Sequence, residues 1–186
     1  NRPGLLGQVG DLTVQTKVVE FNDLPALAAA LAERDLGALR FRERVALAIR
    51  LRLDGADKEL VRRGSALFAL PHHAIEGAGL IWATSDAIWT ALGDTSRDLS
   101  WYSKRASLSA VYGATVLFWL GDTSDRDEAT WAFLDRRIEN VMQFEKLKAG
   151  AQKAPGFQAL MKGPLKILER ISAPKGTSDL PGKMKG

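Results

Sequence analysis

Apolar residues in this sequence recur at helical spacing, and no stretch alternates apolar and polar residues as a half-buried strand would. Residues 39–55 illustrate the pattern, with Val45, Ile49 and Leu53 on one stripe and arginines on the other faces. β-branched residues are scattered rather than grouped into runs of strand length. The sequence therefore predicts an all-α fold.

The expected helices follow one another with short connections. Glycines and prolines mark many of their ends, as expected for residues that terminate helices. We predict helices at residues 24–37, 39–55, 57–71, 72–93, 99–121, 128–148 and 157–171. The first 20 residues are rich in glycine and predict a short helix at best.

Length and charge divide the chain into a body and a tail. Its 186 residues are enough for one domain with its own core. Residues 146–186 carry nine basic and two acidic side chains, a net charge of +7, whereas the rest of the chain carries −3. We expect a helical domain at 1–148, a linker at 149–156, an amphipathic helix at 157–171 and a flexible basic tail at 172–186.

The predicted helix at 157–171 has one basic face and one apolar face. The apolar face consists of Phe157, Leu160, Met161, Leu165, Leu168 and Ile171. Such a helix either lies in a membrane interface or packs on the domain with its lysines reaching solvent, and the pattern leaves both open. A basic tail also suits nucleic acid, but no basic recognition helix is paired with a turn. We therefore expect no nucleic acid, and a membrane partner stays one of the two open interpretations of this helix.

Several kinds of chemistry are excluded or unsupported. The chain has no cysteine, which excludes disulfides, thiolate catalysis and zinc–cysteine sites. His72 and His73 are adjacent, and neighbours on a helix point about 100° apart, so we expect no metal site. No P-loop, nucleophile elbow or acid–base pair is recognisable. The longest uncharged run, residues 106–121, is too short to span a bilayer. The sequence gives no positive evidence for an enzyme.

The tetrapeptide Gly-Asp-Thr-Ser occurs at 93–96 and again at 121–124, each time where one predicted helix ends and another begins. Both glycines fit the position past a helix end that needs positive φ. The Asp, Thr and Ser side chains can accept hydrogen bonds from the first amides of the next helix. Asp98 and Asp127 would add negative charge there. We interpret both copies as helix junctions rather than as a repeated catalytic loop.

Residues 85–105 place aromatic, acidic and basic side chains around the first junction. Lys104 and Arg105 lie in the first turns of their helix, where the helix dipole disfavours cations, so they need acidic partners. The candidates are Asp86, Asp94 and Asp98. Trp, Tyr and Arg dominate protein interfaces, but aromatics at a helix junction also fill cores. The pattern alone leaves both interpretations open.

Three motifs resemble a known family. They are D-x-I-W-x-x-x-G-D-x-S-x-D at 86–98, W-Y-[ST]-K-R at 101–105 and D-x-S…T-W-x-F-L-D-R-R-I at 122–138. In composition and order they are similar to the accessory lipid-binding proteins of coenzyme Q (ubiquinone) biosynthesis, the family numbered nine in that pathway. The resemblance covers roughly residues 10–145.

The resemblance implies a TetR-regulator-like helical bundle that forms homodimers and does not act on DNA. It implies a non-catalytic protein whose only bound group is a lipid or isoprenoid quinone precursor, held in an apolar cavity and presented to the di-iron hydroxylase of the pathway. The cavity would lie among the helices at 39–54, 57–70, 74–92 and 99–120. We expect its lining to include Leu67, Leu70, Ile81, Trp82, Leu108, Val111, Tyr112 and Thr115.

The resemblance also implies a surface patch that contacts the hydroxylase. Matched position by position, that patch is Asp86, Ile88, Leu92, Trp101, Tyr102 and Arg105. One departure is Val116, which stands where the family's T-E-L motif has an acid.

The resemblance implies that the 157–171 helix engages a membrane. This would be the cytoplasmic face of a bacterial inner membrane or the matrix face of the mitochondrial inner membrane. The chain starts with Asn and lacks the helix-turn-helix region that opens a TetR-type chain, so we expect that an N-terminal segment is missing. The alternative function is a ligand-responsive regulator of TetR type, which would need a basic recognition helix upstream.

Overall fold

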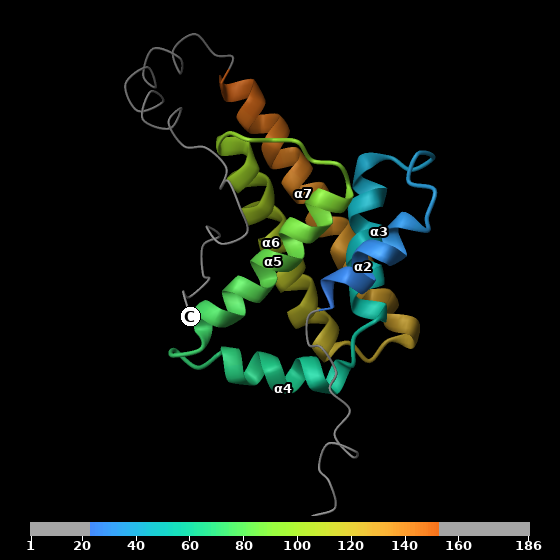
Figure 1. Ribbon diagram of the computed structural model, residues 1–186, viewed down its shortest axis with the longest axis vertical. Coiled ribbons are helices and arrows are strands. Elements are labelled where there is room, and N and C mark those ends of the chain that lie inside the picture. Colours follow the sequence, from blue (N-terminus) through green and yellow to red (C-terminus); the bar gives the residue numbers. More distant parts are fainter. Residues whose placement is uncertain (1–22, 153–186) are drawn as a thin grey trace, which may run out of the picture.

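The computed structural model describes residues 23–152, and within this range the chain contains helices and no strand (Figure 1). The helices are α2 (Leu24–Ala32), α3 (Phe41–Asp54), α4 (Lys58–Phe68), α5 (Ala74–Ala91), α6 (Leu99–Gly121) and α7 (Glu128–Gln152), with a 3₁₀ turn η1 (Asp125–Asp127) before α7. The all-α prediction is confirmed, whereas the TetR-like arrangement stays a prediction. No helix in this range is long and apolar enough to cross a membrane.

Aspartates begin three of these helices, as capping preferences lead one to expect. The carboxylates of Asp23, Asp57 and Asp98 each accept a hydrogen bond from a backbone amide in the first turn of α2, α4 and α6. The predicted ends lie within three residues of the observed ones except in α7, which continues four residues past the predicted 148, and in α2, which ends five residues before the predicted Gly37. There the Asp35 carboxylate accepts a hydrogen bond from the Gly37 amide, a local turn that competes with the helix. The predicted helix at 157–171 lies outside the described residues.

The core lies along α6, which packs against both α5 and α7, while α2 covers α5 and α3 covers α7. The predicted stripe of α3, Val45, Ile49 and Leu53, is buried as expected. Fully buried Leu31, Ile88 and Leu134 come from α2, α5 and α7. These side chains form one continuous cluster.

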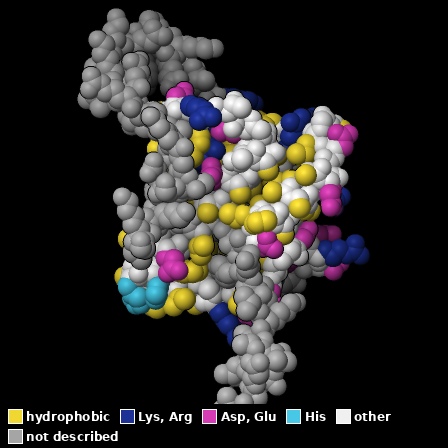
Figure 2. Space-filling model, viewed as in Figure 1, with side chains coloured by type: hydrophobic (Ala, Val, Ile, Leu, Met, Phe, Trp, Pro, Cys, Tyr) yellow, Lys and Arg dark blue, Asp and Glu magenta, His cyan; other side chains and the backbone are white. Residues whose placement is uncertain are grey.

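Helix α4 differs from the others because none of its residues is buried. It contacts α5 and α6 and runs across one end of the bundle (Figure 1). Leu67, Leu70 and Ile75 stay exposed at this corner. Hydrophobic side chains accordingly surround the two histidines in the space-filling view (Figure 2). With no residue of α4 buried, a hollow remains beneath it.

The two Gly-Asp-Thr-Ser segments are both helix junctions, as predicted, but they turn differently. Gly93 has φ 82°, which confirms the expected left-handed glycine. The same prediction is wrong for Gly121, which is the last residue of α6. The left-handed residues of the second junction are Arg126, with φ 49°, and Asp127, with φ 56°.

Candidate functional site

A hollow of about 400 Å³ lies between α4, α5 and α6, with one residue of α3 at its edge. Its apolar wall comes from all three helices and includes Val61, Phe68, Leu80, Ile81, Val116 and Leu117. A hollow of this size and character is typical of small-molecule sites. We call it the α4–α6 cavity.

Small residues on facing helices create the space. The α4–α6 cavity is also lined by Ala69, Ala74, Gly77, Ala78 and Gly113. A Cβ atom on Gly77 would lie 2.6 Å from the Cβ of Phe68, so this glycine is required for α4 to approach α5. A Cβ on Gly113 would meet only the Cδ1 of Ile81, at 3.6 Å, so Gly113 leaves room rather than permitting a tight contact.

The polar groups of the α4–α6 cavity are few and largely satisfied. Burial raises the pKa of the Tyr112 hydroxyl, against opposing contributions from Arg52 and the Thr84 hydroxyl, so Tyr112 is a neutral hydrogen-bonding group. Thr84 donates to the carbonyl of Leu80 at 3.1 Å. One cation, Arg52, lies at the rim. The cavity therefore suits a mostly uncharged, apolar ligand.

The structure places the eight predicted cavity residues in five different surroundings. Ile81 and Tyr112 line the α4–α6 cavity. Leu67 and Leu70 are exposed on α4 and just after it, and Thr115 is fully buried with its hydroxyl bonded to the Val111 carbonyl. Leu108 and Val111 line a second hollow on the other side of α6, and Trp82 stacks near Trp101 and Tyr102.

Sequence reasoning missed the residues that make the cavity. Gly77 and Gly113 sit inside predicted helices, where a glycine weakens the helix and therefore points to a packing role, and Ala78 adds a small side chain beside Gly77. Val116, noted as a departure from the family motif, is part of the apolar wall. Small residues at helix-interior positions were the available signal.

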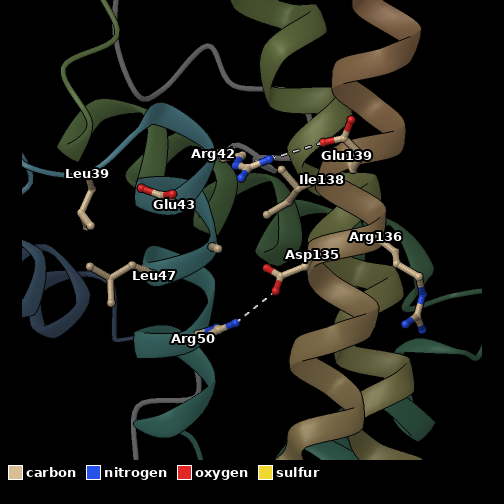
Figure 3. A pocket seen from close by; sticks show the side chains of 10 residues that line it. Leu39, Arg42, Glu43, Leu47, Arg50, Asp135, Arg136, Ile138 and Glu139 are labelled. Carbon is tan, nitrogen blue, oxygen red and sulfur yellow. Dashed lines mark hydrogen bonds and ion pairs between the residues drawn. The ribbon is translucent and has the colours of Figure 1, made fainter.

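Two further hollows flank α3. One, of about 440 Å³, lies between α3, α6 and α7 and is called the α3–α7 groove below. The other, of about 600 Å³, is charged: Arg42 and Arg50 of α3 reach Glu139 and Asp135 of α7 at 3.7 and 3.5 Å (Figure 3). Because its cations and acids pair across the gap, this third hollow offers no unbalanced charge to a ligand.

The predicted partner patch is organised around a buried arginine. The Nε of Arg105 lies 2.6 Å from Asp86 and its Nη1 lies 2.9 Å from Asp94, and the guanidinium lies over the Trp101 ring at 4.0 Å. The Nζ of Lys104 lies 2.7 Å from Asp94. The acidic partners that the sequence required are therefore confirmed as Asp86 and Asp94, while Asp98 caps α6.

Asp94 holds this cluster together. The side chains of Arg105 and Asp94 are each 3% exposed. Burial alone would raise the pKa of Asp94, but hydrogen bonds from Lys104, Ser96 and Arg105 outweigh it and hold the pKa well below its usual range. Asp94 is therefore ionised throughout the physiological range, and two cations share its charge.

The six predicted patch residues fall into an inner and an outer layer. Ile88, Trp101 and Arg105 are buried, and Ile88 has no exposed area. The remaining three, Asp86, Leu92 and Tyr102, are partly exposed. The edge of the Tyr102 ring faces Trp101, with centroids 4.8 Å apart. The core interpretation therefore applies to the inner layer, whereas the interface interpretation of the outer layer stays a prediction.

Trp82 extends the outer layer. Its ring centroid lies 6.0 Å from Trp101 and 6.4 Å from Tyr102, and its Nε1 is buried without a hydrogen-bond partner within residues 23–152. The sequence predicted Trp82 as a cavity residue. One turn of α5 contributes both to the α4–α6 cavity and to the patch, and the sequence does not separate the two. The structure groups it with the patch.

The two histidines line neither the α4–α6 cavity nor the patch, although His73 directly precedes Ala74 of the cavity wall. The rings of His72 and His73 are 4.3 Å apart at the α4–α5 corner, and Nδ1 of His73 lies 3.5 Å from Glu76. Within the described part of the chain, no group of three or more His, Asp or Glu side chains could hold a metal ion.

Comparison with known proteins identifies a family. A family model described as COQ9 matches residues 74–145. The chain is 34% identical over 124 residues to the probable ubiquinone biosynthesis protein coq9, mitochondrial, of Dictyostelium discoideum, which covers 66% of this chain and 40% of that protein. The residues matched by the family model, 74–145, contain the whole predicted partner patch but not α4.

Two other relatives agree. The chain is 36% identical over 80 residues to the human ubiquinone biosynthesis protein COQ9, mitochondrial, covering 43% of this chain and 25% of the human protein. It is 32% identical over 118 residues to the Schizosaccharomyces pombe protein of the same description, covering 62% of this chain and 47% of that protein. The chain thus spans less than half the length of each of these relatives.

Proposed function

Because the chain belongs to the COQ9 family of ubiquinone biosynthesis proteins, we propose that it is a non-catalytic, lipid-binding accessory protein of that pathway. It binds an isoprenoid quinone precursor and presents it at a membrane to the di-iron hydroxylase. The observation that carries the proposal is the apolar α4–α6 cavity, which small residues keep open. Its neutral wall suits a polyprenyl or acyl tail.

The energetics explain why a cavity is needed. Removing apolar surface from water contributes about 25 cal/mol per Å². An isoprenoid in a bilayer, however, is already in apolar surroundings, so the protein gains nothing from burial unless it offers a comparably apolar site. The α4–α6 cavity meets this requirement, and Leu117 at its wall is 69% exposed, which extends the apolar surface to the outside.

The cavity is tested by filling it. In the Gly113→Leu variant a side chain enters the space opposite Ile81, and leucine also has the higher helix propensity, so the fold should survive. We expect lipid in an organic extract of the purified wild-type protein, and its loss in the variant, by mass spectrometry. Ala110→Leu is the matched control, since Ala110 lies on the exposed side of the same helix. Absence of lipid from wild type, or equal lipid in both variants, contradicts the proposal.

The hydroxylase contact is assigned to the outer layer of the patch. Tyr102→Ala removes a partly exposed ring and should weaken hydroxylase binding in a pull-down while leaving thermal stability near that of wild type. Trp101→Ala should instead lower stability, because Trp101 is buried under Arg105. Unchanged hydroxylase binding by the Tyr102 variant would place the contact elsewhere.

Membrane attachment is assigned to the predicted amphipathic helix at 157–171, outside the described residues. Deleting residues 150–186 should abolish flotation with anionic liposomes, and flotation that survives the deletion refutes this assignment. The relatives are described as mitochondrial. We assign the attachment to the matrix face of the mitochondrial inner membrane or, in a bacterium, to the cytoplasmic face of the inner membrane.

The homodimer is supported by apolar side chains outside the cavity. Phe118 of α6 stacks on Phe133 of α7 with centroids 4.5 Å apart, and Phe118 and Phe144 are both exposed. A contact with a second copy would cover them. Sedimentation equilibrium tests this, and a monomer at micromolar concentration would refute it.

A further inference from the structure

The α3–α7 groove is chemically different from the α4–α6 cavity. It lies where α3 begins, along the first half of α6 and the second half of α7. Its floor is apolar and joins the core, with Val45, Leu108, Val111, Ile138, Val141 and Met142. Its volume is about 440 Å³, within the range of ligand sites.

Aromatic rings form one end of the α3–α7 groove. Phe41 and Trp89 stack with centroids 5.4 Å apart, and Phe41 is 50% exposed although it begins a core helix. The indole Nε1 of Trp89 donates a hydrogen bond to the Lys104 carbonyl at 3.1 Å, which restrains the Trp89 ring. A half-exposed ring on a fixed one provides an apolar wall at the mouth of the groove.

The rim of the α3–α7 groove is cationic. It carries Arg42, Lys104 and Lys146 against one acid, Glu145. Arg42 lies 3.7 Å from Glu139 and Lys104 is bound to Asp94, but Lys146 is exposed and has no partner within the described residues. By contrast, Arg52 is the one cation of the α4–α6 cavity.

Serine hydroxyls complete the rim. Ser100, Ser103 and Ser107 follow one another along the same side of α6 and all line the α3–α7 groove. Ser103 donates to the Ser100 carbonyl at 3.2 Å. The Ser107 hydroxyl is half-buried and makes no hydrogen bond within residues 23–152. The Ser100 hydroxyl donates to the Asp98 carboxylate, so the available groups beside the apolar floor are the Ser107 hydroxyl and the Lys146 ammonium.

We propose that the α3–α7 groove is a second ligand site, which binds a single-chain amphiphile with an anionic head. The chain lies over Leu108, Val111 and Val141. The head faces Lys146, Lys104 and the Ser107 hydroxyl. A fatty-acid carboxylate and a prenyl or alkyl phosphate share this chemistry. The site is separate from the α4–α6 cavity, and the two would take different classes of lipid.

Calorimetric titration of the delipidated full chain tests the site. The probes are decanoate, decyl phosphate and decanol, which share a ten-carbon chain and differ in the head. Decanoate or decyl phosphate should bind about tenfold more tightly than decanol. The stronger of the two anions identifies the natural head as a carboxylate or a phosphate. Equal binding of decanol, or no binding of either anion, overturns the proposal.

Variants locate the bound probe. Ser107→Phe projects a ring into the α3–α7 groove and should weaken anion binding by at least about tenfold, whereas Gly113→Leu in the other cavity should not. Lys146→Glu should weaken it about threefold, and the matched charge change Arg63→Glu on exposed α4 should not. If the Ser107 variant does not fold, Val141→Trp on α7 replaces it.

The reverse pattern refutes the second site. Anion binding lost in Gly113→Leu but kept in Ser107→Phe would assign the amphiphile to the α4–α6 cavity. A change of oligomeric state in Ser107→Phe would mean that a second copy covers the groove, which also refutes the proposal. Loss of co-purified lipid in Gly113→Leu, the test of the proposed function, can succeed or fail independently of these results.

Discussion

At the first Gly-Asp-Thr-Ser junction Asp94 faces two cations of α6, whereas at the second junction Asp122 faces the start of α7. The Asp94 carboxylate binds Lys104 and Arg105. The Asp122 carboxylate instead accepts hydrogen bonds from the Thr130 amide and hydroxyl, at 2.8 and 2.5 Å. The same four letters thus build an ion-pair cluster in one place and a helix cap in the other.

The surrounding helices account for this difference. In the first copy α5 supplies Asp86, so that Arg105 is buried between two carboxylates. In the second copy α4 supplies Lys58, whose ammonium binds the Asp122 carbonyl and the Asp127 carboxylate. Asp127 also accepts from the Trp119 indole at 2.9 Å, which holds the left-handed turn in place. A local motif therefore fixes the junction, and its tertiary neighbours fix its role.

Exchanging the two aspartates for asparagine should give the largest contrast. Asp94→Asn leaves the buried Arg105 with one carboxylate instead of two and should lower the free energy of unfolding by about 3 kcal/mol. Asp122→Asn keeps an oxygen that can accept from Thr130, so its loss should be clearly smaller. Urea denaturation followed by circular dichroism measures both.

Binding to the proposed hydroxylase partner is a second measurement for the Asp94→Asn and Asp122→Asn variants. Asp94→Asn should weaken it, because Arg105 supports the Trp101 ring beneath Tyr102, and Asp122→Asn is the control far from the patch. Equal stability losses in the two variants would mean that both aspartates act as helix caps, which contradicts the ion-pair role assigned to Asp94.

Acid should weaken the Asp94 cluster in a defined pH window. Because the pKa of folded Asp94 lies below its ordinary value, the carboxylate stabilises the fold fully above the unfolded pKa of about 4. That contribution is lost progressively as the pH falls from there through the folded pKa. The stability gap between wild type and Asp94→Asn should stay constant from pH 7 to 5 and shrink by about 1 kcal/mol by pH 3. Urea unfolding at each pH measures the gap, and a gap that widens in acid contradicts the assignment.

The two glycines should respond to alanine with opposite signs. Gly93 has φ 82°, a conformation that alanine adopts at a cost of about 1 kcal/mol. Gly121 is helical and a Cβ there meets nothing within 4 Å, so alanine should stabilise by up to about 0.5–1 kcal/mol. Thermal unfolding of Gly93→Ala and Gly121→Ala compares them. A loss of equal size in both would indicate that Gly121 also needs its flexibility.

Sequence reasoning predicted the helices well because their signals are local. Apolar spacing, with glycines and prolines near the helix ends, located every helix between residues 23 and 152, and the need of Lys104 and Arg105 for acids predicted their partners. Gly121 is the exception. The sequence predicted it as the residue past the end of a helix, but α6 includes it, and the chain turns later, at Arg126 and Asp127. Trp119 and Lys58 hold that turn through Asp127, and Lys58 is remote in sequence.

The candidate site was less predictable because it depends on which face of a helix meets which neighbour. Ile81 and Trp82 are adjacent on α5, yet Ile81 lines the α4–α6 cavity and Trp82 joins the patch. Leu108 and Val111 face the opposite side of α6 from Gly113, and line the other groove. A sequence shows that α6 is apolar on several faces, but not which of them is left unfilled.

The smallest effects are expected at the threonines, which complete the comparison. Thr95 and Thr123 occupy the same place in the two copies, and both are exposed. Neither makes a side-chain hydrogen bond with any residue from 23 to 152. Thr95→Ala and Thr123→Ala should therefore change the free energy of unfolding by no more than about 0.5 kcal/mol each, measured by urea denaturation.

A larger loss at Thr95 alone would show that the cation cluster extends to this hydroxyl through water. A larger loss at Thr123 alone would assign it to the cap of α7. Two null results would leave the aspartates and glycines as the residues that distinguish the junctions.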